Sequence, residues 1–106
     1  VQADESVHLV LKSVGTMPKQ TMAHDFVLVE QKTDLIRFNA EAFNARDTDF
    51  IPPDMKDAVL AQTGLAGAGE TVDVTFTASS KPGRCPFFCS FPGHFSEGMR
   101  GVLEVK

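Results

Sequence analysis

Three side chains that can bind a soft metal ion lie close together near the C-terminal end of the chain. Cys89, His94 and Met99 place a thiol, an imidazole and a thioether within eleven residues. Sulfur and imidazole ligands favour copper, zinc or an iron–sulfur centre over magnesium or calcium. A fourth ligand would have to come from another part of the chain. The chain has only three histidines, so the search for that ligand is short.

The size and composition of the chain predict one domain with one site. It has 106 residues, of which 42% are hydrophobic, which is enough for a modest core but not for two. We therefore expect residues 1–106 to form a single domain. No apolar run approaches the ~20 residues that span a bilayer, and the first residues lack the features of a signal peptide. The formal net charge of −4 and the scattered Lys and Arg argue against a nucleic-acid partner.

The elements that must position these ligands are predicted by alternating apolar and polar residues. Asp34 as N-cap and apolar residues at intervals of three and four predict one short helical insertion around residues 34–46. Turn signals between short strands predict an all-β fold, a Greek-key β-sandwich or barrel. The stretch 47–56 is interpreted as loop and the glycine-rich stretch 65–70 as a flexible connection. The predicted strands are 6–12, 26–29, 58–61, 71–78, 85–89 and 101–106.

The two cysteines are not expected to form a disulfide. Cys85 and Cys89 are four residues apart in a predicted strand, where their Cα atoms would be ~13 Å apart at about 3.3 Å per residue. A disulfide requires less than about 7 Å. Cys85 is therefore interpreted as a structural or partly exposed thiol.

The position of the histidines selects the fourth ligand. His8 falls on the wetter face of the first predicted strand, where an exposed histidine is the simplest interpretation. His24 lies at the mouth of the strand at 26–29, where its side chain can be held rigidly. Together with Cys89, His94 and Met99 it gives a trigonal plane of two imidazoles and one thiolate with a weak axial thioether. This is the arrangement of a blue-copper electron-transfer site.

Several motifs resemble those of the azurins, which are members of the cupredoxin family. The resemblance implies an eight-stranded Greek-key sandwich with a helical flap, one copper ion, and one-electron transfer in the periplasm. It places the copper ligands at His24, Cys89, His94 and Met99, and a weak axial carbonyl at Ala23, where azurins have Gly. The motifs are Met22-Ala23-His24, Ala61-Gln62-Thr63, Gly67-Ala68-Gly69-Glu70, Val74-Thr75-Phe76, Phe87-Phe88-Cys89-Ser90-Phe91-Pro92-Gly93-His94 and Met99-Arg100-Gly101-Val102-Leu103.

The resemblance also extends to the residues around the ligands and to partners. Asp25, Ser90 and Phe91 are expected to surround the site, with the backbone N–H of Phe91 and a second loop amide bonded to the Cys89 sulfur. Phe91, Pro92 and Phe95 are expected to form an apolar docking patch around the ring edge of His94. The implied partners are redox proteins such as c-type cytochromes or a copper or haem reductase or oxidase.

The chain departs from the azurin pattern in three places. Four residues separate His94 from Met99 where azurins have three, a spacing nearer that of plastocyanin or auracyanin. Asp25 stands where azurins have Asn, and a carboxylate cannot donate the amide hydrogen bond that joins the two halves of the azurin site. The N-terminal azurin strands and their disulfide have no counterpart here. A sheet edge is therefore expected to be exposed, or covered by something outside this chain.

Three other functions remain possible from the residues alone. Cys85 and Cys89 before His94 and Met99 could form a binuclear copper centre, although the intervening residues look like a core strand. The domain could belong to a larger multicopper enzyme such as a nitrite reductase, but the further histidines of a catalytic copper are missing, since only His8 is left over. Copper storage or delivery is the third alternative.

Overall fold

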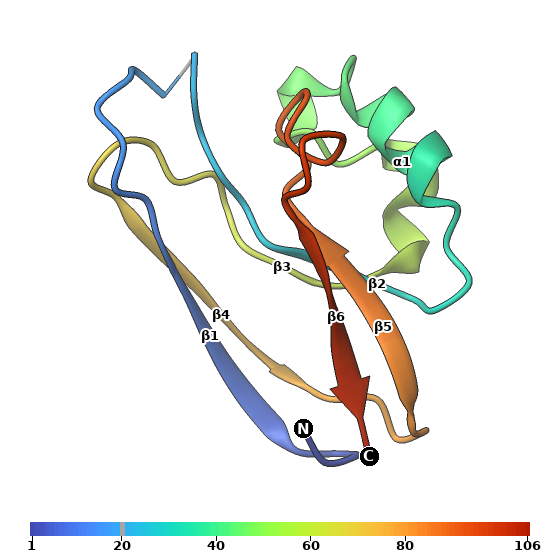
Figure 1. Cartoon of the computed structure of the whole chain (residues 1–106). Coiled ribbons are helices and arrows are strands. Elements are labelled where there is room, and N and C mark those ends of the chain that lie inside the picture. Colours follow the sequence, from blue (N-terminus) through green and yellow to red (C-terminus); the bar gives the residue numbers. More distant parts are fainter. Residues whose placement is uncertain (20) are drawn as a thin grey trace.

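The computed structural model describes residues 1–19 and 21–106, and within them it has six strands and one α-helix. The strands form two antiparallel sheets, one with the order β1-β4 and the other with the order β3-β2-β5-β6 (Figure 1). The all-β prediction is thus confirmed. The elements in chain order are β1 (Ser6–Lys12), β2 (Val27–Val29), α1 (Leu35–Ala42), η1 (Arg46–Thr48), η2 (Pro53–Ala58), β3 (Val59–Gln62), β4 (Thr71–Thr77), β5 (Gly83–Phe88) and β6 (Arg100–Val105).

The four-stranded sheet has an apolar cluster on each face because side chains alternate along its strands. Val27, Val29 and Phe88 belong to a cluster that includes Phe38 and Ala42 of α1. A second cluster, on the side of the β1-β4 sheet, consists of Phe26, Leu28, Ala61 and Cys85, with Leu9, Val74, Phe76, Phe87 and Leu103 packed against it. The four-stranded sheet therefore lies between α1 on one face and the β1-β4 sheet on the other. Its strand β2 is buried along its whole length.

The helix is shorter than predicted. The Asp34 side chain accepts a hydrogen bond from the Arg37 backbone N–H (3.0 Å), which confirms the expected N-cap, but α1 ends at Ala42. Its C-cap, Phe43, is 63% exposed. The chain then turns back so that the Phe50 N–H bonds the Ala45 carbonyl (2.8 Å) and the ring of Phe50 becomes buried. The stretch 47–56, predicted as loop, contains the end of η1 and the start of η2, which begins at Pro53.

The ligand-bearing loop and the chain termini lie at opposite ends of the molecule. Figure 1 shows the loop after β5 (red) beside α1, and both termini at the far end of the sheets. There the Val1 amino group donates to the Glu104 carbonyl (2.9 Å) and the Ala3 N–H to the Lys106 carbonyl (3.0 Å). The first residues of the chain thus partly cover the end of β6, which is an edge of the four-stranded sheet.

Candidate metal centre

The candidate ligands come from two segments that the fold holds side by side. His24 precedes β2, and its backbone is fixed by two hydrogen bonds to Ala66, from the His24 N–H (3.0 Å) and from the Ala66 N–H (2.7 Å). Ala66 is fully buried. The stretch interpreted as a flexible connection is therefore, at Ala66, a fixed part of the site. Sequence patterns missed this because an isolated bridge has no periodicity.

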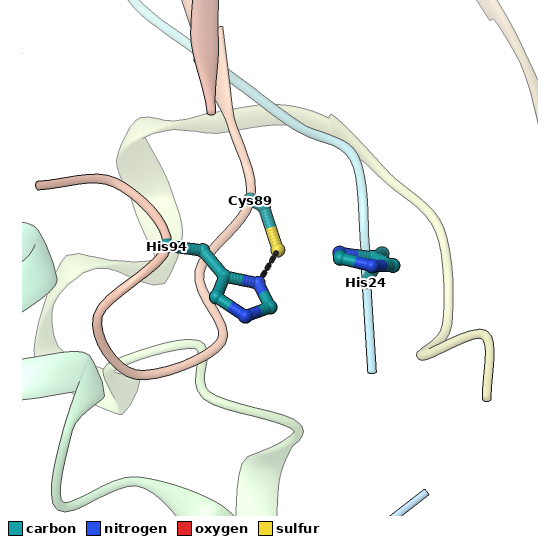
Figure 2. A group of neighbouring side chains, drawn as sticks. All are labelled: His24, Cys89 and His94. Carbon is teal, nitrogen blue, oxygen red and sulfur yellow. Dashed lines mark hydrogen bonds between the residues drawn. The ribbon is translucent and has the colours of Figure 1, made fainter. Parts of the chain in front are cut away.

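The loop that carries Cys89 and His94 is closed by its own backbone. The Cys89 N–H bonds the Met99 carbonyl (3.1 Å), and the Met99 N–H bonds the His94 carbonyl (3.0 Å). Gly93 has a φ of +87°, a left-handed conformation that glycine adopts without the steric cost of a Cβ atom. This turn directs the His94 side chain back toward Cys89 (Figure 2).

The three side chains meet at one point, as Figure 2 shows. One ligand atom from each of His24, Cys89 and His94 lies within 4.8 Å of the others. Cys89 Sγ is 3.3 Å from His94 Nδ1, and the two imidazole centroids are 4.9 Å apart. Cys89 and His94 are buried. Within the part of the chain that the structure describes, this is the one such group of His, Cys, Asp and Glu side chains.

The donors present fit a copper ion. His24 Nδ1 is buried and has no hydrogen-bond partner among the described residues. A buried polar atom without a partner is costly, so a ligand role gives this nitrogen the partner that the protein does not supply. A thiol and two imidazoles form the His₂Cys plane typical of blue-copper sites. We infer that this group can hold copper through the sulfur of Cys89 and one imidazole nitrogen each of His24 and His94.

Asp25 joins the two segments of the site, although it cannot donate a hydrogen bond. Its Oδ1 accepts from the Ser90 N–H (2.7 Å) and its Oδ2 from the Ser90 hydroxyl (2.6 Å). Asp25 cannot supply the amide donor of the azurin site. The backbone N–H and the hydroxyl of Ser90 are instead the two donors, and Asp25 accepts from both. Burial raises the pKa of Asp25 to about 6, and the hydrogen bonds from Ser90 oppose this rise.

The Cys89 thiol lies in a site where its charged form is unfavourable unless a cation is present. Burial, with a contribution from the charge of Asp25, raises the Cys89 pKa to about 12. Backbone hydrogen bonds from Asp25 and Phe91 act in the opposite direction, so the second amide at the sulfur comes from the His24 segment and not from the loop. Burial, followed by the neighbouring His24, lowers the pKa of His94. Neutral imidazole is the form that binds metal ions.

The remaining predicted site residues lie around the group of His24, Cys89 and His94 and differ in their exposure. Met99 is 40% exposed and lines a cavity together with His24 and His94, and its backbone closes the ligand loop. Ala23 is fully buried next to His24. Of the predicted docking patch, Pro92 and Phe95 are half-buried. Phe91 is buried because it packs against Phe50 and the His94 ring, with centroids 5.2 and 5.0 Å away, so it supports the patch from beneath.

Comparison with known proteins agrees with this geometry. The model of the copper-binding proteins of the plastocyanin/azurin family matches residues 4–106. The chain belongs to this family. It is therefore a blue-copper family protein whose cofactor is copper, and His24, Cys89 and His94 are its candidate copper ligands.

Individual relatives within the plastocyanin/azurin family are auracyanins and azurins. The chain is 40% identical over 83 residues to auracyanin-B of Chloroflexus aurantiacus, which covers 77% of this chain and 35% of auracyanin-B. It is 40% identical over 96 residues to azurin iso-2 of Methylomonas sp. (strain J), covering 87% of this chain and 71% of that azurin. It thus spans about a third of the length of the first relative and most of the second.

Solved structures of family members share the fold. The structure of dithionite-reduced auracyanin from Roseiflexus castenholzii superposes with a TM-score of 0.85 at 32% identity, covering 100% of this chain and 81% of that one. Auracyanin B superposes with a TM-score of 0.82 at 34% identity, covering 99% and 73%. The described residues include no helix with the length and apolar character needed to cross a membrane.

Proposed function

We propose that residues 1–106 form one copper-binding domain that carries single electrons between redox proteins. The observation that carries this proposal is the convergence of His24, Cys89 and His94 within 4.8 Å on a point where His24 Nδ1 has no other partner among the described residues. When bound, copper supplies the Cu(I)/Cu(II) couple. The residues hold one geometry for both oxidation states, so little rearrangement accompanies electron transfer.

Each ligand has a separate role in this proposal. Cys89 would hold the copper as a thiolate, and His24 and His94 would hold it as neutral imidazoles. Met99 and the Ala23 carbonyl would be two weaker ligands. Support for Met99 comes from its backbone hydrogen bonds to Cys89 and His94, which fix its position at the end of the loop.

The residues around the ligands set the redox potential. Asp25 brings a carboxylate close to the site, and a negative charge favours Cu(II) over Cu(I) and lowers the potential. Ser90 holds that carboxylate through two hydrogen bonds. The backbone N–H groups of Phe91 and Asp25 act on the Cys89 sulfur in the opposite sense, because they reduce its electron donation to copper.

Electrons enter and leave beside His94. Pro92 and Phe95 flank this residue and form an apolar surface on which a redox partner can dock, while Phe91 supports the His94 ring from below. The partners proposed from the family are c-type cytochromes or a copper or haem reductase or oxidase. We place the chain in the periplasm or another extracytoplasmic compartment. A relative named outer membrane protein H.8, from Neisseria meningitidis, supports this; it is 39% identical over 88 residues, which cover 81% of this chain and 46% of H.8.

Electron exchange and copper release distinguish an electron carrier from the alternatives. We expect a reversible one-electron couple, fast electron self-exchange measured by NMR line broadening, and slow loss of copper to a chelator. Rapid copper release with slow self-exchange would instead indicate copper storage or delivery. Nitrite reduction by the isolated chain would indicate an enzyme. The Cys85→Ser variant, which keeps all the proposed ligands, is the control for these four measurements.

A further inference from the structure

A cavity of about 630 Å³ is lined by His24 and His94, two of the proposed copper ligands. Residues 11–17, at the end of β1 and after it, line the same cavity. Three of the four methionines of the chain, Met17, Met22 and Met99, line this cavity together with His24 and His94. Met17 and Met22 have no part in the proposed copper site.

Met17 and Met22 line the same cavity and flank backbone hydrogen bonds to Pro18. The Met22 N–H and the Thr21 N–H both bond the Pro18 carbonyl, each at 2.9 Å. These bonds fix the backbone of Met22 relative to Pro18, the residue after Met17. Met22 lies two residues before His24.

The copper ligands are less exposed to solvent than the thioethers that line the cavity. Met17 is 47% and Met99 40% exposed, whereas Cys89 is 3% and His94 6% exposed. An ion that reaches Cys89 must therefore leave water before it meets the thiol. Thioether sulfur is a soft donor that selects Cu(I) over hard cations such as Mg²⁺ or Ca²⁺.

We propose that Met17 and Met22 form an entry site for Cu(I), from which the ion passes to His24, Cys89 and His94. This inference rests on the proposed copper site. In the transfer the bonds to the two thioether sulfurs break as bonds to the thiolate and the imidazoles form, and the Cys89 proton leaves to water. Copper stays Cu(I) throughout, so no oxidant or reductant is needed.

A second opening is less suited to Cu(I). A cavity of about 310 Å³ is lined by Cys89, but it contains one methionine, Met99, and its charged residues, Asp25 and Arg100, have opposite signs. In the larger cavity, Lys12 and Glu97 carry opposite charges and add no net repulsion of a cation. The two cavities therefore have balanced charges, and the larger one differs by its additional soft donors.

The test is the rate at which the copper-free protein takes Cu(I) from a bicinchoninate complex under anaerobic conditions. We expect M17L/M22L to take up Cu(I) about tenfold more slowly than the native chain, which is about 1.4 kcal/mol in the barrier. Met55→Leu is the matched control, because Met55 packs against the core cluster beside α1 and does not line this cavity. It should load at the native rate. Equal rates for M17L/M22L and Met55→Leu would overturn the entry site.

Two further measurements keep the result specific. Uptake of Cu(II) from its chloride salt should be equally fast in both variants, since thioethers favour Cu(I), and a matching loss for Cu(II) would overturn the proposal. The single variant Met17→Leu, at a half-exposed position, covers the case in which the double variant does not fold, and should also slow Cu(I) loading. If the native chain loads copper but never develops a thiolate-to-copper absorption band, the proposed copper site fails, whatever the loading rates.

Discussion

Cys85 and Cys89 are both buried but have different surroundings. Cys85 is 8% exposed and lies in the apolar cluster of Phe26, Leu28 and Ala61. Cys89 is 3% exposed, and its sulfur is 3.3 Å from His94 Nδ1 and receives backbone hydrogen bonds from Asp25 and Phe91. Burial raises the pKa of both thiols. A metal ligand is therefore distinguished by the polar groups around the thiol and not by its burial.

The largest effect that tests this difference is expected from Cys89→Ser. No other sulfur can enter the ligand plane, because Cys85 lies in the other apolar cluster. We expect complete loss of the thiolate-to-copper band in the absorption spectrum of the copper-loaded variant. Persistence of the band would refute the ligand role of Cys89.

The matched change, Cys85→Ser, should leave the band intact and reduce stability. It places a hydroxyl in an apolar cluster in which the thiol has no hydrogen bond among the described contacts. Burying an unbonded hydroxyl costs about 1–3 kcal/mol. Urea unfolding of the copper-free protein measures this cost. A change in the absorption band would mean that Cys85 does contribute to the metal site.

Ser90→Ala tests the support of the ligand region. It removes the hydroxyl bond to Asp25 Oδ2 (2.6 Å) and keeps the backbone bond to Oδ1. Loss of one hydrogen bond to a buried carboxylate should lower the free energy of unfolding by about 1 kcal/mol. It should also broaden the bands in the spectrum of the bound copper, because the segments that carry Asp25 and Ser90 are then joined less rigidly. An unchanged unfolding midpoint and spectrum would show that the backbone bond alone fixes Asp25.

Met99→Leu separates the axial ligand from the ligands in the plane. Met99 is 40% exposed, so stability of the copper-free protein should change by no more than about 0.5 kcal/mol. The blue band should persist and the redox potential should rise, because loss of a donor disfavours Cu(II). Voltammetry checks this, and an unchanged potential would mean that Met99 is not an axial ligand.

The smallest effect is expected at Glu70, which supports the segment that holds His24. Its Oε1 accepts from the Gly67 N–H (2.6 Å), and this bond, followed by the charge of Lys19, lowers the Glu70 pKa. A carboxyl whose folded pKa is lowered stabilises the fold above its unfolded pKa and loses that contribution as the pH falls through the folded value. Glu70→Gln should therefore lower the thermal midpoint slightly at neutral pH and make it less sensitive to acid. A thermal midpoint of the Glu70→Gln variant that falls with decreasing pH as steeply as that of the native chain would contradict this expectation.

The strands and three ligands of the site could be predicted because they depend on local patterns. Alternation fixes which residues of β1 and β4 face inward, and the short loop from Cys89 to His94 leaves few arrangements for their side chains. His24 was found because it lies directly before a buried apolar strand, where the chain is held rigidly. These signals depend on neighbours in sequence.

The features that sequence patterns missed depend on contacts between distant segments. A strand continuing through Cys89 would place Cys85 and Cys89 on one face, but β5 ends at Phe88 and Cys89 joins the cluster beside α1. The bridge of Ala66 to His24 and the burial of Phe50 beneath the loop are also long-range contacts. No local propensity encodes them, because tertiary packing determines where an element ends.

The most direct test of the mononuclear site is an EPR spectrum of the oxidised, copper-loaded chain, recorded together with its metal content. We expect one copper per chain and a narrow four-line hyperfine pattern, since one nucleus interacts with the unpaired electron and the electron is shared with the Cys89 sulfur. Two coppers per chain with a seven-line pattern would show an electron shared between two nuclei, and would contradict the separation of Cys85 from Cys89.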